Sequence, residues 1–298
     1  MKKLKTPVSL LLFVLFLPLF SFCQNMEDVE ITTEKLTDNI YALFGRGGNI
    51  GLCVGEDGAI LIDDQYAPLT EKISAAIAEI TDKPVKFLIN THWHGDHTGG
   101  NENFGKKGAL IFAQENVRNR MSKEQLREPE RPNVPASPKV ALPVVTFKED
   151  LTFHLNGEEI LVFHIHHAHT DGDAIVYFPK SNVIHMGDTF FNGRFPFIDL
   201  NSGGGVDGMI RAANKVLFLA DDETKIIPGH GKVAGKPELR TFRDMLLSVR
   251  DRVKKAIKDG KSLEEIKTAG LTKEYEGWGS GFINPERFME ILYTDLSK

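Results

Sequence analysis

Residues 89–100 read INTHWHGDHTGG and place four potential metal ligands within six positions: His92, His94, Asp96 and His97. The stretch follows VKFLIN (85–90), whose apolar composition predicts a strand. A packed core would not tolerate so many unpartnered polar side chains, and a solvated loop has no need of them. The pattern therefore predicts a metal site directly after this strand.

Three further candidates each stand at or just after a strand-like run: His169 in HHAHTDGD, Asp188 in HMGDTF and His230 in IPGHG. Ligands on loops beyond strand ends can converge at one rim of a rigid scaffold. Imidazole and carboxylate ligands without thiolate suit zinc, and also iron or manganese. Seven ligands exceed one tetrahedral ion, so we expect two ions that share a carboxylate.

The remaining pattern predicts strands, then helices, in two successive sets. In the first half we expect strands at 40–45, 50–55, 59–63, 85–90 and 109–113, with helices at 68–81 and 114–126. In the second half we expect strands at 145–147, 150–165, 173–179, 183–188 and 225–230, with an Asn-Gly turn at 156–157, and helices at 206–220, 236–258, 262–268 and 285–296. The proline-rich stretch 127–143 reads as a loop. This order predicts two sheets in contact, with helices outside them.

The motif HxHxDH at 92–97, with His-Thr at 169–170, Gly-Asp at 187–188 and Pro-Gly-His at 228–230, resembles the metallo-β-lactamase superfamily. The resemblance implies an α+β fold, a four-layer αββα sandwich with a dinuclear site. It also implies the ligand sets, with Asp188 bridging the two ions and Asp96 taking part in the chemistry. The first ion would be held by His92, His94 and His169, and the second by Asp96, His97 and His230.

The same resemblance implies a metal-dependent hydrolase with two Zn²⁺, iron or manganese being alternatives. We expect metal-bound hydroxide to cleave a carbonyl-derived bond in a β-lactam or other amide, a lactone or an ester. Asp188 stands where the most familiar zinc β-lactamases carry cysteine, an arrangement of glyoxalase-II-like and lactonase-like members. A thioester hydrolase of the glyoxalase-II type is therefore one alternative. An iron-dependent redox member is another, although such members usually replace one motif histidine by glutamate and this chain keeps His94.

Other histidines have plainer interpretations. His167 is the reserve candidate for the position assigned to His169. His164 and His166 alternate with apolar residues and are expected to line one strand face, and His154 and His185 read as ordinary strand residues. For the hydrogen-bond partners that orient ligand histidines, the sequence offers only Asp173 and Thr98 as guesses.

Specificity is expected to depend on FFNGRFPFIDLNSGGGV (190–206), which directly follows Asp188. Its four phenylalanines and Arg194 would suit a small-molecule substrate with an acyl group and a carboxylate, or would simply form an aromatic core. RGGN (46–49) and EGWGSGF (276–282), with Trp278 as a stacking surface, are further candidate loops.

The N-terminus predicts export. Three lysines (Lys2, Lys3, Lys5) precede an apolar run from about Val8 to Phe22, as in a secretory signal peptide. Cleavage before Gln24 would give a signal peptide at 1–23, a single catalytic domain with a C-terminal helical region at 24–298, and a periplasmic or secreted protein. The alternatives are lipid anchoring at Cys23, which the bulky Phe22 disfavours, and an uncleaved anchor, for which the run is short. We therefore expect no stable membrane span after cleavage.

Composition narrows the partners further. The formal net charge of −5 offers no basic footprint for a nucleic acid. Once Cys23 is removed with the signal, Cys53 alone remains, so no internal disulfide is expected.

Overall fold

The strands have two buried faces, and this is the basis of the architecture. Along β4 (Ala59–Ile62) all four residues are buried. Ile60 and Ile62 belong to the apolar layer between the two sheets, whereas Ala59 and Leu61 belong to the layer beneath the outer helices. Since successive side chains of a strand point to opposite faces, an all-apolar strand requires cover on both sides.

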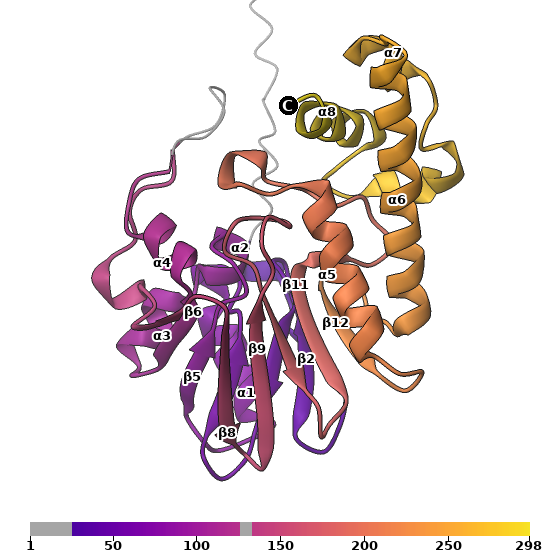
Figure 1. Ribbon diagram of the computed structural model, residues 1–298. Coiled ribbons are helices and arrows are strands. Elements are labelled where there is room, and N and C mark those ends of the chain that lie inside the picture. The colour runs from indigo at the N-terminus through magenta and orange to yellow at the C-terminus, as the bar shows by residue number, and fades with distance from the viewer. Residues whose placement is uncertain (1–25, 126–132) are drawn as a thin grey trace, which may run out of the picture.

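The computed structural model describes residues 26–125 and 133–298 (Figure 1). Within them, the first sheet has seven strands in chain order: β1 (Thr32–Lys35), β2 (Ile40–Phe44), β3 (Ile50–Cys53), β4, β5 (Val85–Ile89), β6 (Leu110–Gln114) and β7 (Val145–Phe147). The second has five, in spatial order β12 (Lys225–His230), β11 (Val183–Phe191), β10 (Ala174–Phe178), β9 (Glu158–His164) and β8 (Asp150–Leu155). Strands β4 to β7 run parallel, and β11 pairs with β12 in parallel.

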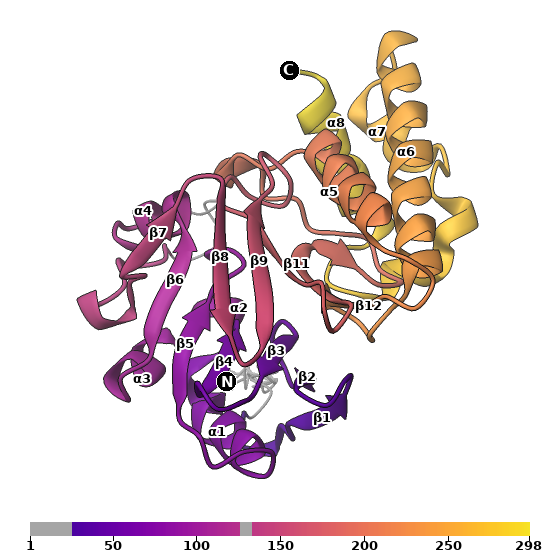
Figure 2. The ribbon, with the colours of Figure 1, turned by 60° about the horizontal axis from the view of Figure 1, so that its bottom comes forward.

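Helices cover the outer face of each sheet. The first sheet is covered by α1 (Thr70–Ala78) and α3 (Asn101–Lys106), while α4 (Glu115–Met121) lies against β6 and β7. The second is covered by α5 (Val206–Leu219), α6 (Lys236–Lys258) and α8 (Pro285–Leu296), and α7 (Leu263–Thr268) packs on α8. Figure 2 shows α5, α6 and α8 gathered beside β11 and β12, away from α1 and α3. The four-layer αββα sandwich predicted from the sequence is confirmed.

The structure differs from the predicted elements in a few places. Strand β1 was not predicted because its sequence, TTEK, is exposed along its length and carries no apolar alternation. The polar helix expected at 114–126 ends at Met121, and β11 continues past Asp188 to Phe191. The candidate loop at 276–282 begins within 3₁₀ turns that span Lys273–Ser280.

Two predictions fall on parts of the chain beyond the described residues. The signal peptide and Cys23 lie there, as do the first residues of the proline-rich loop. Among the described residues, no helix combines the length and apolarity that crossing a bilayer requires.

Candidate metal centre

The ligand-rich loop links β5 to α3 and is closed by its own side chains. Asn90 and Asn101 exchange hydrogen bonds of 2.9 and 3.0 Å across its base, fully buried. Between them, one short helix, α2 (Gly95–Thr98), begins after His94, whose extended backbone at φ −65° and ψ 147° starts the turn. This compact turn directs the side chains of His92, His94, Asp96 and His97 toward the same region beyond the end of β5.

The second sheet supplies the other three candidates. His169 lies between β9 and β10, Asp188 lies within β11, and His230 ends β12. The pairing of β11 with β12 is irregular around Gly187, which adopts a φ of +52°. A side chain there would come within 2.6 Å of the Thr91 hydroxyl, so only glycine lets β11 approach the ligand loop this closely.

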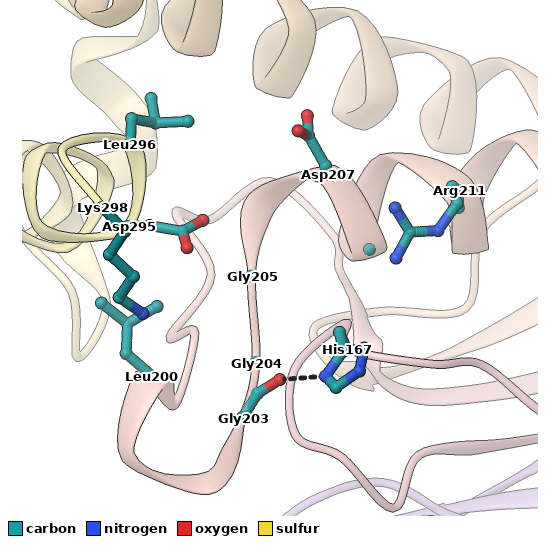
Figure 3. Close-up of a pocket in the computed structure, with 11 residues that line it drawn as sticks. His167, Leu200, Gly203, Gly204, Gly205, Asp207, Arg211, Asp295, Leu296 and Lys298 are labelled. Atoms are coloured by element: carbon teal, nitrogen blue, oxygen red, sulfur yellow. Dashed lines mark hydrogen bonds between the residues drawn. The ribbon is translucent and has the colours of Figure 1, made fainter.

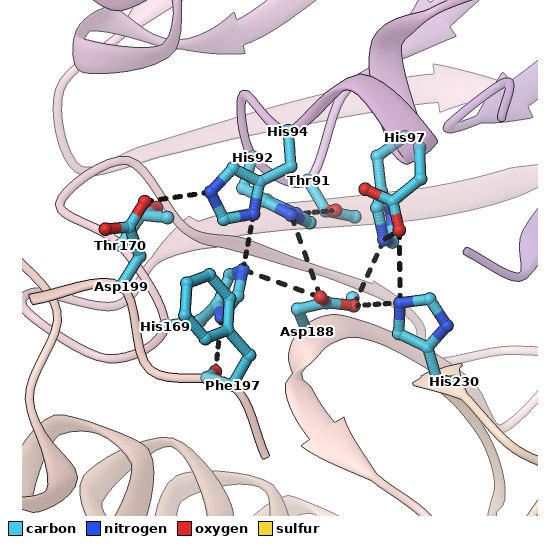
Figure 4. Close-up of polar contacts among 12 residues, drawn as sticks. Thr91, His92, His94, His97, His169, Thr170, Asp188, Phe197, Asp199 and His230 are labelled. Atoms are coloured by element: carbon cyan, nitrogen blue, oxygen red, sulfur yellow. Dashed lines mark hydrogen bonds and ion pairs between the residues drawn. The ribbon is translucent and has the colours of Figure 1, made fainter. Parts of the chain in front are cut away.

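The structure brings all seven predicted residues together in two groups, drawn in Figure 4. The first group comprises His92, His94, His169 and Asp188, and the second comprises Asp96, His97 and His230; in each, the potential ligand atoms lie within 4.8 Å of one another.

Asp188 faces both groups. Its Oδ2 lies 3.4 Å from His169 Nε2 and 3.9 Å from His92 Nε2, whereas its Oδ1 lies 3.1 Å from His97 Nε2 and 3.4 Å from His230 Nε2. One carboxylate therefore connects the two groups through separate oxygens.

Hydrogen bonds on the outer side of four imidazoles decide which nitrogen faces the centre. His97 Nδ1 donates to Asp63 Oδ2 at 2.7 Å, and His169 Nδ1 donates to the Phe197 carbonyl at 2.7 Å. His94 Nε2 donates to Asp199 Oδ2 at 2.9 Å. The Thr91 hydroxyl donates to Asp63 and so accepts from His92 Nδ1 at 3.1 Å. Each ring is thereby oriented with its other nitrogen inward, the nitrogen that a metal-binding histidine would use once deprotonated.

The inward atoms fit cations. His92 Nε2, His97 Nε2 and Asp188 Oδ1 are buried without a hydrogen-bond partner, which is unusual for native polar atoms. His94 Nδ1 and His169 Nε2 lie 2.9 Å apart, although the opposite nitrogen of each ring already carries the proton. Two facing lone pairs at this distance repel unless a cation lies near both.

Burial and the neighbouring charges shift the pKa values of the side chains in the cluster. Burial lowers the pKa of His92 well below its usual value and that of His169 to about 4, so both favour the neutral form that binds metal. Burial opposes a charge on His230, but Asp188 and Asp96 outweigh it and raise its pKa to about 9. Burial likewise opposes ionisation of Asp96, yet His97 and His230 lower its pKa to about 2.

The orienting partners were missed by the sequence analysis. Asp63 and Asp199 hold His97 and His94, whereas Thr98 donates to the backbone carbonyls of Trp93 and His94. Asp173 accepts from the backbone and hydroxyl of Thr170 instead of a ligand ring. Both guesses were wrong. Asp63 is a polar residue directly after strand β4, a signal that was available, but Asp199 has no local signal.

The other histidines lie outside the cluster. His185 is buried and hydrogen-bonds the Asn49 carbonyl, and His164 donates to the Asp173 carbonyl. His166 pairs with Glu149, and the reserve candidate His167 turns to the Gly203 carbonyl at 2.9 Å.

The aromatic stretch divides into two roles. Phe190 and Phe195 are buried in the core beneath the outer helices. Phe191 stacks on the His230 imidazole with ring centroids 5.3 Å apart, and Phe197 lies beside His94 and His169. Trp278 is not free to stack on a substrate with its whole face, because it packs parallel to Phe242 at 6.4 Å.

A separate pocket opens behind the loop that carries Asp199 (Figure 3). His167 and Gly203 line it, together with Asp207 and Arg211 of α5 and the end of α8. Asp295 of α8 accepts a hydrogen bond from the Val206 amide at 2.8 Å and so attaches the C-terminal helix to this loop. None of the seven ligand candidates lines this pocket.

The αββα sandwich and its histidine and aspartate cluster, together with the relatives reported below, indicate a metal-dependent hydrolase. The family model described as the metallo-beta-lactamase superfamily matches residues 43–230, and the chain belongs to this superfamily.

Known relatives agree with this assignment. The chain is 24% identical over 219 residues to "Metallo-beta-lactamase type 2" of Bacteroides fragilis, which covers 70% of this chain and 82% of the relative. The DIM-1 metallo-beta-lactamase structure superposes with a TM-score of 0.59 at 20% identity, covering 74% of this chain and 98% of that one. The sec-alkylsulfatase Pisa1 from Pseudomonas sp. superposes with a TM-score of 0.65 at 17% identity, covering 89% of this chain and 50% of that one.

Proposed function

We propose that the protein is an exported dinuclear zinc hydrolase that cleaves a carbonyl-derived bond. The observation that carries this proposal is the position of Asp188, whose two oxygens face two separate groups of inward-pointing ligand atoms. A bridging carboxylate between two ions would use both oxygens in this way.

The donor set supports zinc. His92, His94 and His169 would hold one ion and Asp96, His97 and His230 the other, and imidazole with carboxylate is a typical zinc environment. When bound, such an ion pair activates water near neutral pH and stabilises negative charge that develops on a carbonyl oxygen.

Asp96 is the residue proposed to act on the proton. Its side chain keeps 25% of its surface accessible, and its Oδ2 lies 3.4 Å from His230 Nε2. With a pKa of about 2 against the opposing effect of burial, it is a carboxylate at neutral pH. It could therefore accept a hydrogen bond from the attacking water, take up the proton that this water loses on attack, and give the same proton to the leaving group.

The proposed substrate class rests on the relatives of the chain. The names of the relatives favour a β-lactam as the substrate. The proposed chemistry itself does not distinguish a β-lactam from a lactone or from another ester or amide. A small molecule is the expected partner, and the predicted signal peptide would place its hydrolysis in the periplasm or outside the cell.

The first test is metal analysis of protein purified without added metal, combined with a substrate screen. We expect about two zinc ions per chain and hydrolysis of a chromogenic cephalosporin or a homoserine lactone, whereas hydrolysis of a phosphodiester alone would contradict cleavage of a carbonyl-derived bond. Iron with a visible absorption band would instead support the redox alternative. Thioester cleavage alone would support the glyoxalase-II type.

The second test is the matched pair His94→Ala and His154→Ala. The first variant should lose one ion and turnover, whereas the second changes an exposed strand histidine outside the cluster and should keep both. Full activity in His94→Ala would refute the proposed site.

A further inference from the structure

Two phenylalanines from distant parts of the chain form an apolar surface beside the first ligand group; we call Phe197 and Phe282 the aromatic lip. The Phe197 ring centroid lies 5.9 Å from that of His94, nearly stacked, and 5.9 Å from that of His169 (Figure 4). Phe282 comes from the C-terminal region, and its ring meets Phe197 edge-on at 6.0 Å. The C-terminal region thus extends the wall that begins at the ligand histidines.

The backbone around Phe282 is anchored on both sides. Before it, the Trp278 carbonyl accepts a hydrogen bond from the Phe195 amide at 3.2 Å, which joins the 3₁₀ turns to the aromatic stretch. After it, Ile283 is 2% exposed and the Asn284 side chain caps the first turn of α8 at the Arg287 amide. The fold therefore fixes the backbone from which the Phe282 side chain projects.

Despite this anchoring, the Phe282 side chain is 71% exposed. Single exposed apolar residues are common on protein surfaces. What distinguishes Phe282 is its contact with Phe197, whose ring in turn contacts two ligand imidazoles and is itself only partly buried. A ligand covering both rings would remove apolar surface from water at the edge of the reaction centre.

We propose that the aromatic lip is a substrate subsite, which takes an apolar acyl or aryl group adjoining the bond to be cleaved. This inference rests on the proposed function for the location of the reacting bond. Because the lip lies on the side of His94 and His169, the apolar group would extend from the first ligand group, away from Asp96 and His230. Phe282 is then a specificity-determining residue that the C-terminal region contributes.

The test compares binding of straight-chain carboxylates, from acetate to octanoate, to the zinc-loaded full chain by calorimetry. For the wild-type protein, affinity should rise by up to about fourfold per added methylene while the chain covers the lip. Phe282→Ala should bind octanoate about tenfold more weakly and acetate unchanged, since only the longer chain reaches the ring. Phe282→Leu, which keeps apolar bulk, should recover part of the difference.

Phe218→Ala is the matched control, because Phe218 on α5 is 89% exposed and belongs to the same residue type. It should bind both carboxylates as the wild type does. If Phe282→Ala binds octanoate with wild-type affinity, or loses affinity for acetate and octanoate equally, the lip is not a subsite.

The failure of this inference and that of the proposed function are distinguishable. Chain-length-dependent binding without hydrolysis of any screened substrate would contradict the hydrolase and leave the lip as a binding site for apolar chains. Hydrolysis whose preference for acyl length is unchanged in Phe282→Ala would overturn the lip and support the hydrolase.

Discussion

Replacing Asp199 by alanine should weaken zinc binding at the first ligand group without removing a ligand. Asp199 Oδ2 accepts from His94 Nε2 at 2.9 Å, and the two side chains are only 12% and 13% exposed. Such a shielded, charge-assisted hydrogen bond fixes the ring so that Nδ1 points inward. Its loss should raise the dissociation constant of this zinc by about 10- to 100-fold, or about 1.4 to 2.7 kcal/mol.

The assay is a zinc titration in competition with a chromogenic chelator, which resolves the tighter ion from the weaker one. Asp207→Ala is the control, since Asp207 lies on the neighbouring helix and pairs with Arg250, away from the ligands. The second ion should be affected far less than the first, because His97 keeps its bond to Asp63. Two dissociation constants within about twofold of the wild-type values would refute the reasoning, because that change is far below the expected range.

Four further predictions concern the metal groups, the titration of His230 and the aromatic stretch. Gly48→Ala places a methyl group 2.0 Å from the His97 ring, so metal analysis should find the second ion lost, whereas Gly95→Ala, with open space around it, should keep both ions. Zinc loading at pH 7.5 should release the His230 proton, because Asp188 and Asp96 raise the pKa of His230 to about 9 despite burial. Calorimetry in buffers of different ionisation enthalpy measures this proton release. The release should disappear when zinc is loaded at a pH above about 9. The raised pKa of His230 also stabilises the metal-free fold, fully below the usual pKa of 6.5, and this stabilisation is lost as the pH rises through about 9. Thermal melts of metal-free protein should therefore show a melting temperature that falls over this pH range. A melting temperature that does not change with pH would contradict the prediction. Arg194→Ala should raise KM for carboxylated substrates by roughly tenfold with kcat little changed, because the exposed Arg194 is the cation that the sequence predicts to bind a substrate carboxylate. Unchanged kinetics would contradict that prediction.

Sequence alone predicted the features that depend on local pattern. The buried strands β3 and β4 stand out as short continuous apolar runs between turn residues, and the long helix α6 carries an apolar signal with a period of 3.6. The ligand loop was predictable because its chemistry is concentrated in six positions. Strand β1 has no such signal, since it is held by pairing with β2 and not by apolar burial.

What the sequence could not predict is pairing at a distance. Asp199 is 105 residues from the histidine it orients, and Phe282 meets Phe197 only because α8 and the 3₁₀ turns bring the C-terminal region back to the second sheet. Trp278 is a further example of a distant contact that the sequence did not predict. Its glycine-rich surroundings suggested an exposed stacking surface, but the ring packs against Phe242 of α6.

The ligands come from both sheets, four from one loop of the first and three from the second, and this distribution sets an order of events during biogenesis. Neither half of the chain carries a complete set around Asp188, so a nascent or partly folded chain would retain an ion only weakly. If these residues hold the proposed ions, the two sheets must dock before tight capture, and the second ion would connect His97 and His230, which lie more than 130 residues apart in the sequence. Metal content of the purified protein would accordingly report on completed folding as well as on composition of the site.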